Sequence, residues 1–271
     1  MKTGIIIPCY NEEKRLNSAA FLSFIKSHSD YVLCFVNDGS KDNTLGLLRS
    51  VEAQVPTQIT VVDIKRNMGK AAAVRAGARH LYNRQDISYV GFIDADLSTD
   101  FDDFKALVKT LKSDSRLNMV FGSRHSANGA IEQNGFRKMV SNQMRSIIKR
   151  ILGMPINDTQ CGAKVFSRSI IPVIYKEAFL SKWLFDVEIF FRLKKYLGRK
   201  NVMRHVCEQP LQRWVHVDDS RIGLKDSIII PMKLVHIWAS YTLSPFIQLI
   251  CIKKLASPSS IEVFSAEVVQ S

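Results

Sequence analysis

Two aspartates one residue apart, Asp94 and Asp96, end an apolar run in the segment GFIDADLSTD. Like charges at this spacing repel each other, and a divalent cation lying between them and a polyphosphate removes that repulsion. Mg2+ and Mn2+ prefer oxygen ligands, commonly one or two carboxylates with substrate phosphates and water. The pair therefore predicts a metal–diphosphate site. The alternative is a helix N-cap, since acidic residues also favour the start of a helix such as the one expected from Phe101.

Apolar segments suited to buried strands alternate with helical patterns through the first half of the chain. Strands are expected over residues 3–8, 31–36, 59–64, 88–93 and 118–123. Helices are expected over Glu12–Ser27, from near Lys41, over 69–83 and over 101–113. This alternation predicts an α/β fold with a mainly parallel sheet covered by helices on both faces.

Each expected strand is followed by a polar cluster, and these clusters read PCYNEE, NDGSKD, KRNMGK, DADLST and GSRHS. Parallel sheets of this kind bind ligands at the carboxyl ends of their strands. The five clusters therefore predict one shared site at one edge of the sheet.

The second half of the chain is more mixed. We expect a helix over Asn134–Leu152, a loop and strand over 157–167, a helix over Phe185–Tyr196 and a strand over 201–209. Residues 227–252 are apolar over roughly a membrane thickness. Lys233, His236 and two prolines interrupt this stretch, which favours an interfacial amphipathic segment or hairpin, with a buried helix pair as the alternative.

The chain of 271 residues carries a formal net charge of +13, which suggests an anionic partner: nucleic acid, a phosphate-rich ligand or an acidic membrane face. Its five cysteines are scattered without a CxxC pair, so we expect reduced thiols rather than a disulfide framework or a zinc site. The apolar run at the N-terminus is too short for a signal peptide, and we expect a cytosolic protein.

The segments IIIPCYNEE, FVNDGSKDNT, NMGKAAAVRAG and FIDADLS occur in this order. Over about residues 3–220 the chain resembles the family-2 nucleotide-sugar glycosyltransferases, which have the GT-A fold. The later segments GSRHSANG, NDTQCGAKVFSR, WLFDVEIFFR and RWVHVDDSRI resemble the dolichyl-phosphate glucosyltransferase and polyprenyl-phosphate sugar transferase branch.

This resemblance implies a domain organisation. A GT-A domain would cover residues 1–225, with a nucleotide-sugar half to about 123 and an acceptor half from 124. After this domain, the apolar pattern of the residues themselves predicts a membrane-associating segment over 226–254 and a loose tail over 255–271.

The resemblance also implies roles for residues at the strand ends. Pro8, Tyr10 and Glu12 would line the nucleotide pocket beside the base, and Asp38 would accept hydrogen bonds from the base. Gly69 would allow close backbone approach, and Lys70 would meet phosphate charge. Asp94 would lie near the ribose and the metal, with Asp96 as the principal metal ligand.

The acceptor side follows from the branch motifs. Arg124 and Arg137 match acceptor-phosphate arginines, and Arg221 is a further candidate where the motif would have lysine. Asp158 is the candidate base for a hydroxyl acceptor and would orient cations or acceptor oxygens for a phosphate acceptor. Gln160, Trp183 and Asp186 complete the expected acceptor residues; as alternatives, Trp183 could be core and Asp186 a helix N-terminal charge.

A lipid phosphate, with a second pKa of about 6, is largely anionic at pH 7 and needs cations rather than a general base. The sequence thus predicts an inverting, metal-dependent transfer of a hexose to polyprenyl phosphate. The resemblance implies UDP-glucose as the donor ahead of GDP-mannose. The reaction is expected on the cytoplasmic face of a membrane, with the protein attached peripherally or shallowly to an anionic surface.

Four other functions fit parts of the pattern. One is family-2 transfer to a hydroxyl acceptor in glycan synthesis. A second is a phosphatase with a nucleophilic D-x-D, although here the pair follows the fourth expected strand. A third is a sugar-1-phosphate nucleotidyltransferase, which would want a glycine-rich loop where this chain has PCYNEE. The fourth is a nucleic-acid-binding module, which no recognisable motif supports.

Overall fold

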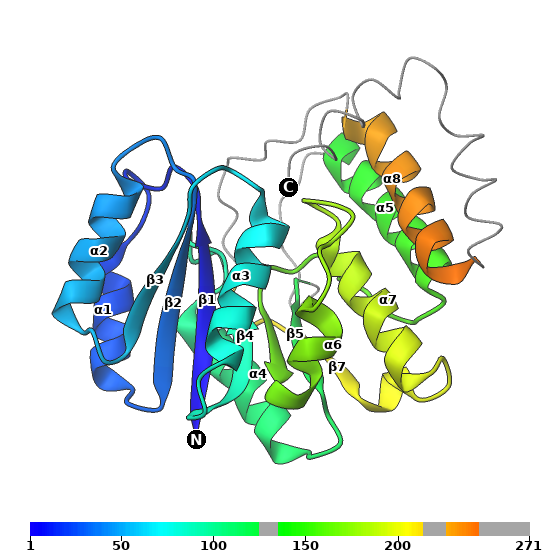
Figure 1. The fold of residues 1–271 in the computed structure, drawn as a ribbon. Coiled ribbons are helices and arrows are strands. Elements are labelled where there is room, and N and C mark those ends of the chain that lie inside the picture. Colours follow the sequence, from blue (N-terminus) through cyan, green and yellow to red (C-terminus); the bar gives the residue numbers. More distant parts are fainter. Residues whose placement is uncertain (125–134, 214–225, 244–271) are drawn as a thin grey trace. The chain divides into compact units, whose positions relative to one another are not determined.

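A computed structural model describes the backbone over residues 1–124, 135–213 and 226–243, and the side chains over 1–124, 144–213 and 230–243. The chain divides into two units, Met1–Arg221 and Ile222–Ser271. The first unit contains the sheet with its covering helices (Figure 1).

The sheet has seven strands in the spatial order β3 (Ile59–Ile64), β2 (Tyr31–Asp38), β1 (Lys2–Cys9), β4 (Ile87–Phe92), β6 (Lys164–Ser167), β5 (Met119–Ser123) and β7 (Val206–Pro210). Of these strands, β6 alone runs antiparallel to its neighbours β4 and β5. The carboxyl ends of the other six strands therefore lie at one edge of the sheet. The predicted mainly parallel, mixed sheet is confirmed.

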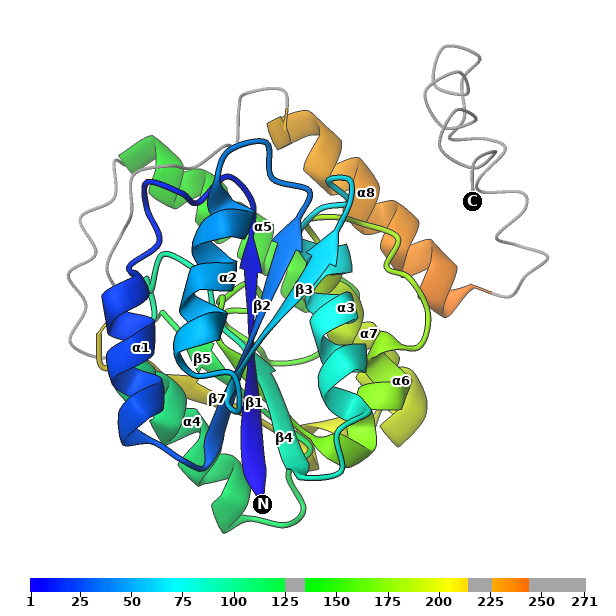
Figure 2. The ribbon, with the colours of Figure 1, turned by 60° about the vertical axis from the view of Figure 1, so that its left-hand side comes forward.

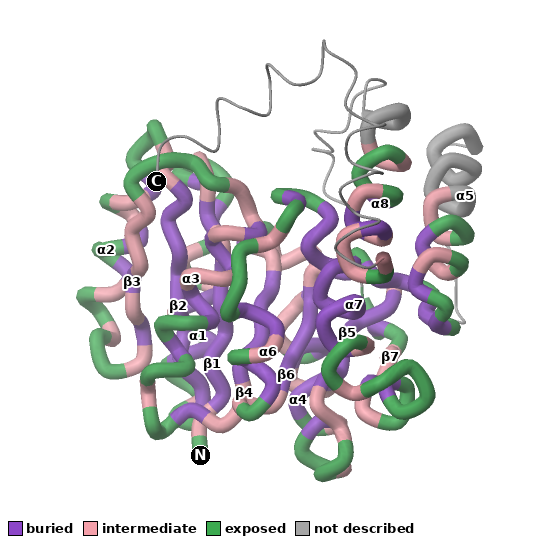
Figure 3. Tube along the Cα trace, turned by 45° about the vertical axis from the view of Figure 1, so that its right-hand side comes forward, coloured by how far each residue is buried: buried purple, intermediate pink, exposed green. Residues whose placement is uncertain are grey.

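The strands form because their apolar runs are buried on both faces. All eight residues of β2 are buried. In β1, Ile5 and Ile7 join the core that also contains Phe21 and Phe104, whereas Ile6 lies on the other face against Gly77. Figure 3 shows the resulting buried strands at the centre of the unit.

Helices cover both faces of the sheet (Figure 2). On one face lie α1 (Ser18–Ser27), α2 (Thr44–Gln54) and α4 (Phe101–Ser113). On the other lie α3 (Lys70–Tyr82), α6 (Ile171–Tyr175) and α7 (Phe185–Leu197), and α5 (Gly135–Leu152) packs against α7.

Three predicted boundaries were wrong. The first helix begins at Ser18 rather than Glu12, because Asn17 caps it by accepting a hydrogen bond from Ala20 N at 3.1 Å. The second helix begins at Thr44 rather than near Lys41. In the segment 201–209, a 3-10 turn precedes the strand, which starts only at Val206.

The N-cap alternative for Asp94 and Asp96 was also wrong. Helix α4 is capped by Asp100, whose Oδ1 accepts a hydrogen bond from Asp103 N at 2.8 Å. The two acids lie in the loop that precedes this cap, and the start of the helix does not explain them.

The second unit contains helix α8 (Asp226–Thr242), which covers the first part of the predicted apolar segment and has Pro231 inside it. Within the described ranges, no helix combines the length and the hydropathy needed to cross a bilayer. The rest of the apolar segment, 244–254, and the tail, 255–271, lie outside the described residues. Membrane association by this segment stays a prediction.

Candidate active site

The five polar clusters follow β1 to β5 as predicted, and the ends of these strands lie along one edge of the sheet. Asp38, at the end of β2, fixes the loop that leads into α3. Its Oδ1 accepts a hydrogen bond from Met68 N at 2.8 Å, and its Oδ2 accepts one from Gly69 N at 2.7 Å. Gly69 has φ of 90° and its α-carbon lies against Lys182, so a side chain there would be strained and crowded. This turn presents Lys70 as the first residue of α3.

Lys70 forms an ion pair with Asp94 Oδ1. The other oxygen, Oδ2, lies against Gly162: a β-carbon at position 162 would be 2.1 Å from it. Burial alone would lower the pKa of Lys70, but the carboxylates of Asp94 and Asp186 outweigh this effect and raise it. In the structure, therefore, the first acid of the pair is compensated by a lysine.

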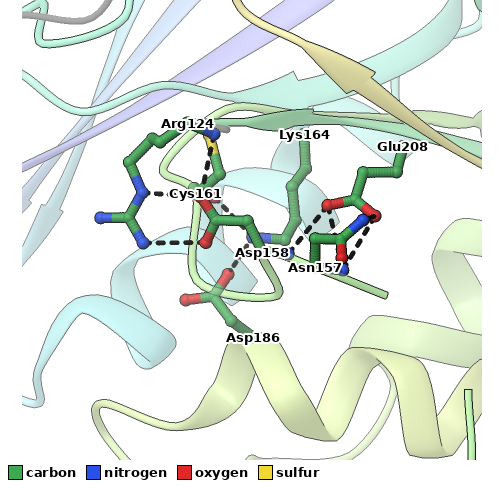
Figure 4. Close-up of polar contacts among 7 residues, drawn as sticks. All are labelled: Arg124, Asn157, Asp158, Cys161, Lys164, Asp186 and Glu208. Atoms are coloured by element: carbon green, nitrogen blue, oxygen red, sulfur yellow. Dashed lines mark hydrogen bonds and ion pairs between the residues drawn. The ribbon is translucent and has the colours of Figure 1, made fainter. Parts of the chain in front are cut away.

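A second ion pair lies behind the first. The Nζ of Lys164, which is fully buried on β6, lies 2.5 Å from Asp186 Oδ1 and donates to Cys161 O at 2.6 Å (Figure 4). Both lysines lie near the Phe92 ring, whose centroid is 6.0 Å from Lys70 Nζ and 5.3 Å from Lys164 Nζ. Burial raises the pKa of Asp186, and the charges of Lys164 and Lys70 oppose that rise. The two acids and two lysines thus form a compact network of alternating charge.

Arg124 and Asp158 form a two-point contact beside this network (Figure 4). Arg124 Nε donates to Asp158 Oδ2 at 2.7 Å and Nη2 donates to Oδ1 at 2.8 Å, while the Arg124 backbone N–H donates to Oδ2 at 3.0 Å. Burial alone would raise the pKa of Asp158, but the hydrogen bonds and charge of Arg124 outweigh it and lower the pKa. Asp158 is therefore a firmly ionised carboxylate and a weak base.

The loop that carries Asp158 is held from β7 and α5. Glu208 on β7 accepts hydrogen bonds from Asp158 N at 2.8 Å and from Asn157 N at 2.9 and 3.1 Å. Lys149, on the last turn of α5, donates to Asn157 Oδ1 at 2.7 Å. Since β7 and α5 both fix this loop, the orientation of Arg124 is fixed with it.

Asp96 has a different environment from Asp94. It is exposed, and its Oδ1 accepts a hydrogen bond from Ser98 N at 2.9 Å. The described side chains contain no group of three or more His, Cys, Asp or Glu residues arranged to hold a metal. An exposed carboxylate beside a second acid fits a Mg2+ or Mn2+ ion that takes its remaining ligands from a bound diphosphate and water.

For the other predicted site residues, the structure shows mainly how far each is buried. Glu12 is buried, and both its carboxylate oxygens are bound by the Arg15 guanidinium. Pro8 and Tyr10 are half-buried at the end of β1, and Gln160 is exposed. Trp183 is 58% exposed, so the alternative that it belongs to the core is wrong.

Two acceptor-side arginines have no described side chain. Arg137 lies in the first turn of α5, and Arg221 lies outside the described residues. Their roles stay predictions.

Three residues of the site were not singled out from the sequence: Gly162, Lys164 and Glu208. Lys164 has a recognisable signal, because a lysine within the apolar strand AKVFS needs a buried partner. Gly162 and Glu208 have none, because their roles depend on contacts between segments far apart in the chain.

Comparisons with known proteins identify the family of this chain. The family model described as glycosyl transferase family 2 matches residues 4–174. A dolichyl-phosphate beta-glucosyltransferase of Trichomonas vaginalis is 32% identical over 245 residues, 86% of this chain and 72% of the relative. One of Dictyostelium discoideum is 31% identical over 89% of this chain and 75% of the relative.

The fold is shared with glucosyl-3-phosphoglycerate synthase from Mycobacterium tuberculosis, solved with Mn2+, UDP-glucose and phosphoglyceric acid. The TM-score is 0.64 at 17% identity, over 89% of this chain and 79% of the other. The GT-A-type sheet and the matching family model together define the class of the protein as a glycosyltransferase. The chain belongs to glycosyl transferase family 2, and the predicted family and fold are confirmed.

Proposed function

We propose that this protein transfers glucose from UDP-glucose to a dolichyl or other polyprenyl phosphate at a membrane surface. The relatives named as dolichyl-phosphate beta-glucosyltransferases support the acceptor and the sugar. The UDP-glucose in the similar solved structure supports the donor. The proposed reaction forms a bond between the anomeric carbon and an oxygen of the lipid phosphate and breaks the bond to the β-phosphate of UDP, with inversion.

The observation that carries the choice of acceptor is the contact between Arg124 and Asp158. A hydroxyl acceptor needs a carboxylate with enough basicity to remove its proton. Asp158 is bound through both oxygens and its pKa is lowered, which makes it poorly suited to that task. A phosphate acceptor is already anionic, so it needs a positioned cation, and Arg124 is held in place by Asp158.

The donor side follows from the two lysine–aspartate pairs. Lys70, at the start of α3, would bind the diphosphate, and Asp38 would hold the backbone that positions it. Asp94 would keep Lys70 oriented and would be a ligand of the metal. The ion pair of Asp186 and Lys164 would stabilise the charges of Lys70 and Asp94. Pro8, Tyr10 and Glu12 would lie beside the base.

Asp96 would hold Mg2+ or Mn2+ together with the nucleotide phosphates. When bound, this ion would act as a Lewis acid that neutralises charge on the departing diphosphate. Loss of one carboxylate ligand should therefore weaken the dependence of nucleotide binding on the metal.

The test is transfer by the purified full-length protein in membranes that contain dolichyl phosphate. Labelled UDP-glucose and labelled GDP-mannose are supplied separately, and lipid is extracted. We expect label from UDP-glucose in an acid-labile lipid fraction, with little from GDP-mannose. Label only in water-soluble product would instead support a hydroxyl acceptor.

Two variants make the assay specific to the site. Asp96→Ala should abolish lipid labelling and the effect of Mg2+ on UDP binding measured by calorimetry. Asp102→Ala, which removes an exposed acid at the start of α4, should leave both unchanged. Equal Mg2+-assisted binding of UDP to Asp96→Ala and to the wild type would contradict the assignment of Asp96.

A further inference from the structure

Three large apolar side chains are exposed where two loops meet at the strand-end edge. Met68, in the loop from β3 to α3, is 51% exposed. Leu180 and Trp183, in the loop from α6 to α7, are 52% and 58% exposed. We refer to these three residues, with Lys182, as the edge patch.

The two loops of the edge patch are in direct contact. The Ala71 N–H donates to Lys182 O at 3.4 Å, and a β-carbon on Gly69 would lie 2.9 Å from Lys182 Cβ. Met68 immediately precedes Gly69, and Trp183 immediately follows Lys182. The exposed apolar residues therefore flank one packed contact and are not scattered over the surface.

The loop from α6 to α7 is held in this conformation by buried groups. The fully buried carboxylate of Glu188 accepts hydrogen bonds from Leu180 N at 3.0 Å and Ser181 N at 2.8 Å. Ser181 Oγ accepts from Trp183 N at 3.3 Å and Leu184 N at 3.0 Å. The backbone is fixed while Leu180 and Trp183 remain exposed, so a partner would meet a pre-organised surface.

The surroundings of the patch are basic. The same two loops contain four exposed basic residues, Lys65, Arg66, Lys176 and Lys182. Two carboxylates accompany them: Asp63, which lies 2.6 Å from Lys65, and the exposed Glu177. The net charge of these residues is therefore positive, and the same two loops carry the exposed aromatic and apolar side chains of the edge patch.

We propose that the edge patch docks onto an anionic lipid bilayer, with Trp183, Leu180 and Met68 entering the headgroup region. Tryptophan beside aliphatic and basic residues is the combination suited to this interface, since apolar area and attraction to anionic lipid add together. This inference rests on the proposed function. Lys70, which would bind the diphosphate, follows Met68 of the edge patch by two residues. Docking here would bring the diphosphate side of the site to the surface where a lipid phosphate lies.

The first test measures binding of the full-length protein to sedimenting vesicles that contain no acceptor lipid. Phosphatidylcholine vesicles are compared with vesicles that also contain phosphatidylserine. Trp183→Ala should lower the partition coefficient about tenfold, because most of the exposed ring area would no longer enter the lipid. Lys182→Ala should lower it about fivefold, and only on the anionic vesicles.

Tyr196→Ala is the matched control. Tyr196 is 63% exposed and lies at the far end of α7, about 16 Å along the helix from Phe185. Its removal should leave vesicle binding unchanged. An equal loss in Tyr196→Ala and Trp183→Ala, or no loss in Trp183→Ala, would overturn the proposal.

A second measurement reads Trp183 directly and does not depend on other membrane-binding segments. In a Trp214→Phe/Trp238→Phe background, binding to anionic vesicles should shift the Trp183 emission to shorter wavelength, and brominated lipid should quench it. Unchanged quenching by aqueous acrylamide in the vesicle-bound protein would contradict docking at this patch. Sedimentation velocity without lipid adds a third outcome: self-association lost in Trp183→Ala would assign the patch to a second copy of the chain.

Failure of the docking proposal is distinguishable from failure of the proposed function, because vesicle binding is measured without donor or acceptor. The variant Leu180→Ala tests whether docking is needed for sugar transfer. It should reduce transfer to dolichyl phosphate in vesicles but retain transfer to the same acceptor dissolved in detergent. Equal loss in both settings would contradict a role in docking.

Discussion

The carboxylate of Asp94 lies against the α-carbon of Gly162, with its other oxygen paired to Lys70. Gly162→Ala should therefore displace Asp94, because the new β-carbon would lie 2.1 Å from Oδ2. We expect kcat/KM for sugar transfer to fall about 100-fold, since small displacements of positioned groups have effects of this size. The loss of folding stability should be smaller, about 1–3 kcal/mol.

A double-mutant cycle isolates this contact. In an Asp94→Ala background, the clash partner is gone, so Gly162→Ala should cost little further stability in denaturant unfolding. A cost equal to that in the wild-type background would show that position 162 acts through some other contact.

The buried pair of Lys164 and Asp186 predicts an unusually costly substitution. Lys164→Met leaves the Asp186 carboxylate buried without its cation, and we expect a loss of about 3–5 kcal/mol in the free energy of unfolding. Lys164→Met/Asp186→Leu should recover most of it. Lys105→Met removes an ion pair with the exposed Asp102 and should cost less than about 1 kcal/mol. Equal losses for the two lysines would contradict this interpretation.

The sheet and the location of the site could be predicted from the sequence because both depend on local patterns. Buried strands appear as apolar runs, and in a parallel sheet their carboxyl ends share an edge, so Asp38, Asp94 and Arg124 could be grouped from the sequence alone. The pairing among the charged groups could not be predicted. Repulsion between Asp94 and Asp96 suggested a metal for both, and nothing in the sequence indicated that Lys70, at the start of α3, also compensates Asp94.

Residues that act through long-range contacts were the hardest to find. Glu208 holds the Asp158 loop from a strand fifty residues later in the chain. The start of the first helix was predicted wrongly for a different reason. The acidic residues before Asn17 also favour a helix start, and in the structure Asn17 is the cap. Local propensity does not decide between such caps.

Asp38 offers a test between two roles, reading the base and holding the loop before α3. Its two oxygens accept hydrogen bonds from Met68 N and Gly69 N. Asp38→Asn keeps one acceptor oxygen but places an amide N–H against the second donor, so we expect a loss of about 1–3 kcal/mol in unfolding free energy. Weaker UDP binding by calorimetry should accompany it. Weaker UDP binding with unchanged stability would assign Asp38 to the base alone.

The pair of Arg124 and Asp158 predicts a pH dependence of stability. The folded-state pKa of Asp158 is lowered, so the carboxylate stabilises the folded protein above its ordinary pKa of about 4, and this contribution is lost as the pH falls through the folded pKa. Asp158→Asn should cost about 2–4 kcal/mol at pH 7. The difference in unfolding free energy between wild type and Asp158→Asn should shrink as the pH is lowered from about 4 toward 2, measured by urea unfolding at each pH.

Asp114→Asn removes an exposed contact with Arg116 of the same two-point geometry and is the matched control. Its effect at pH 7 should stay below about 1 kcal/mol, because solvent screens the pair. A difference for Asp158→Asn that is constant or grows on acidification would mean that Asp158 is not held ionised by Arg124, and the argument for an anionic acceptor would lose its support.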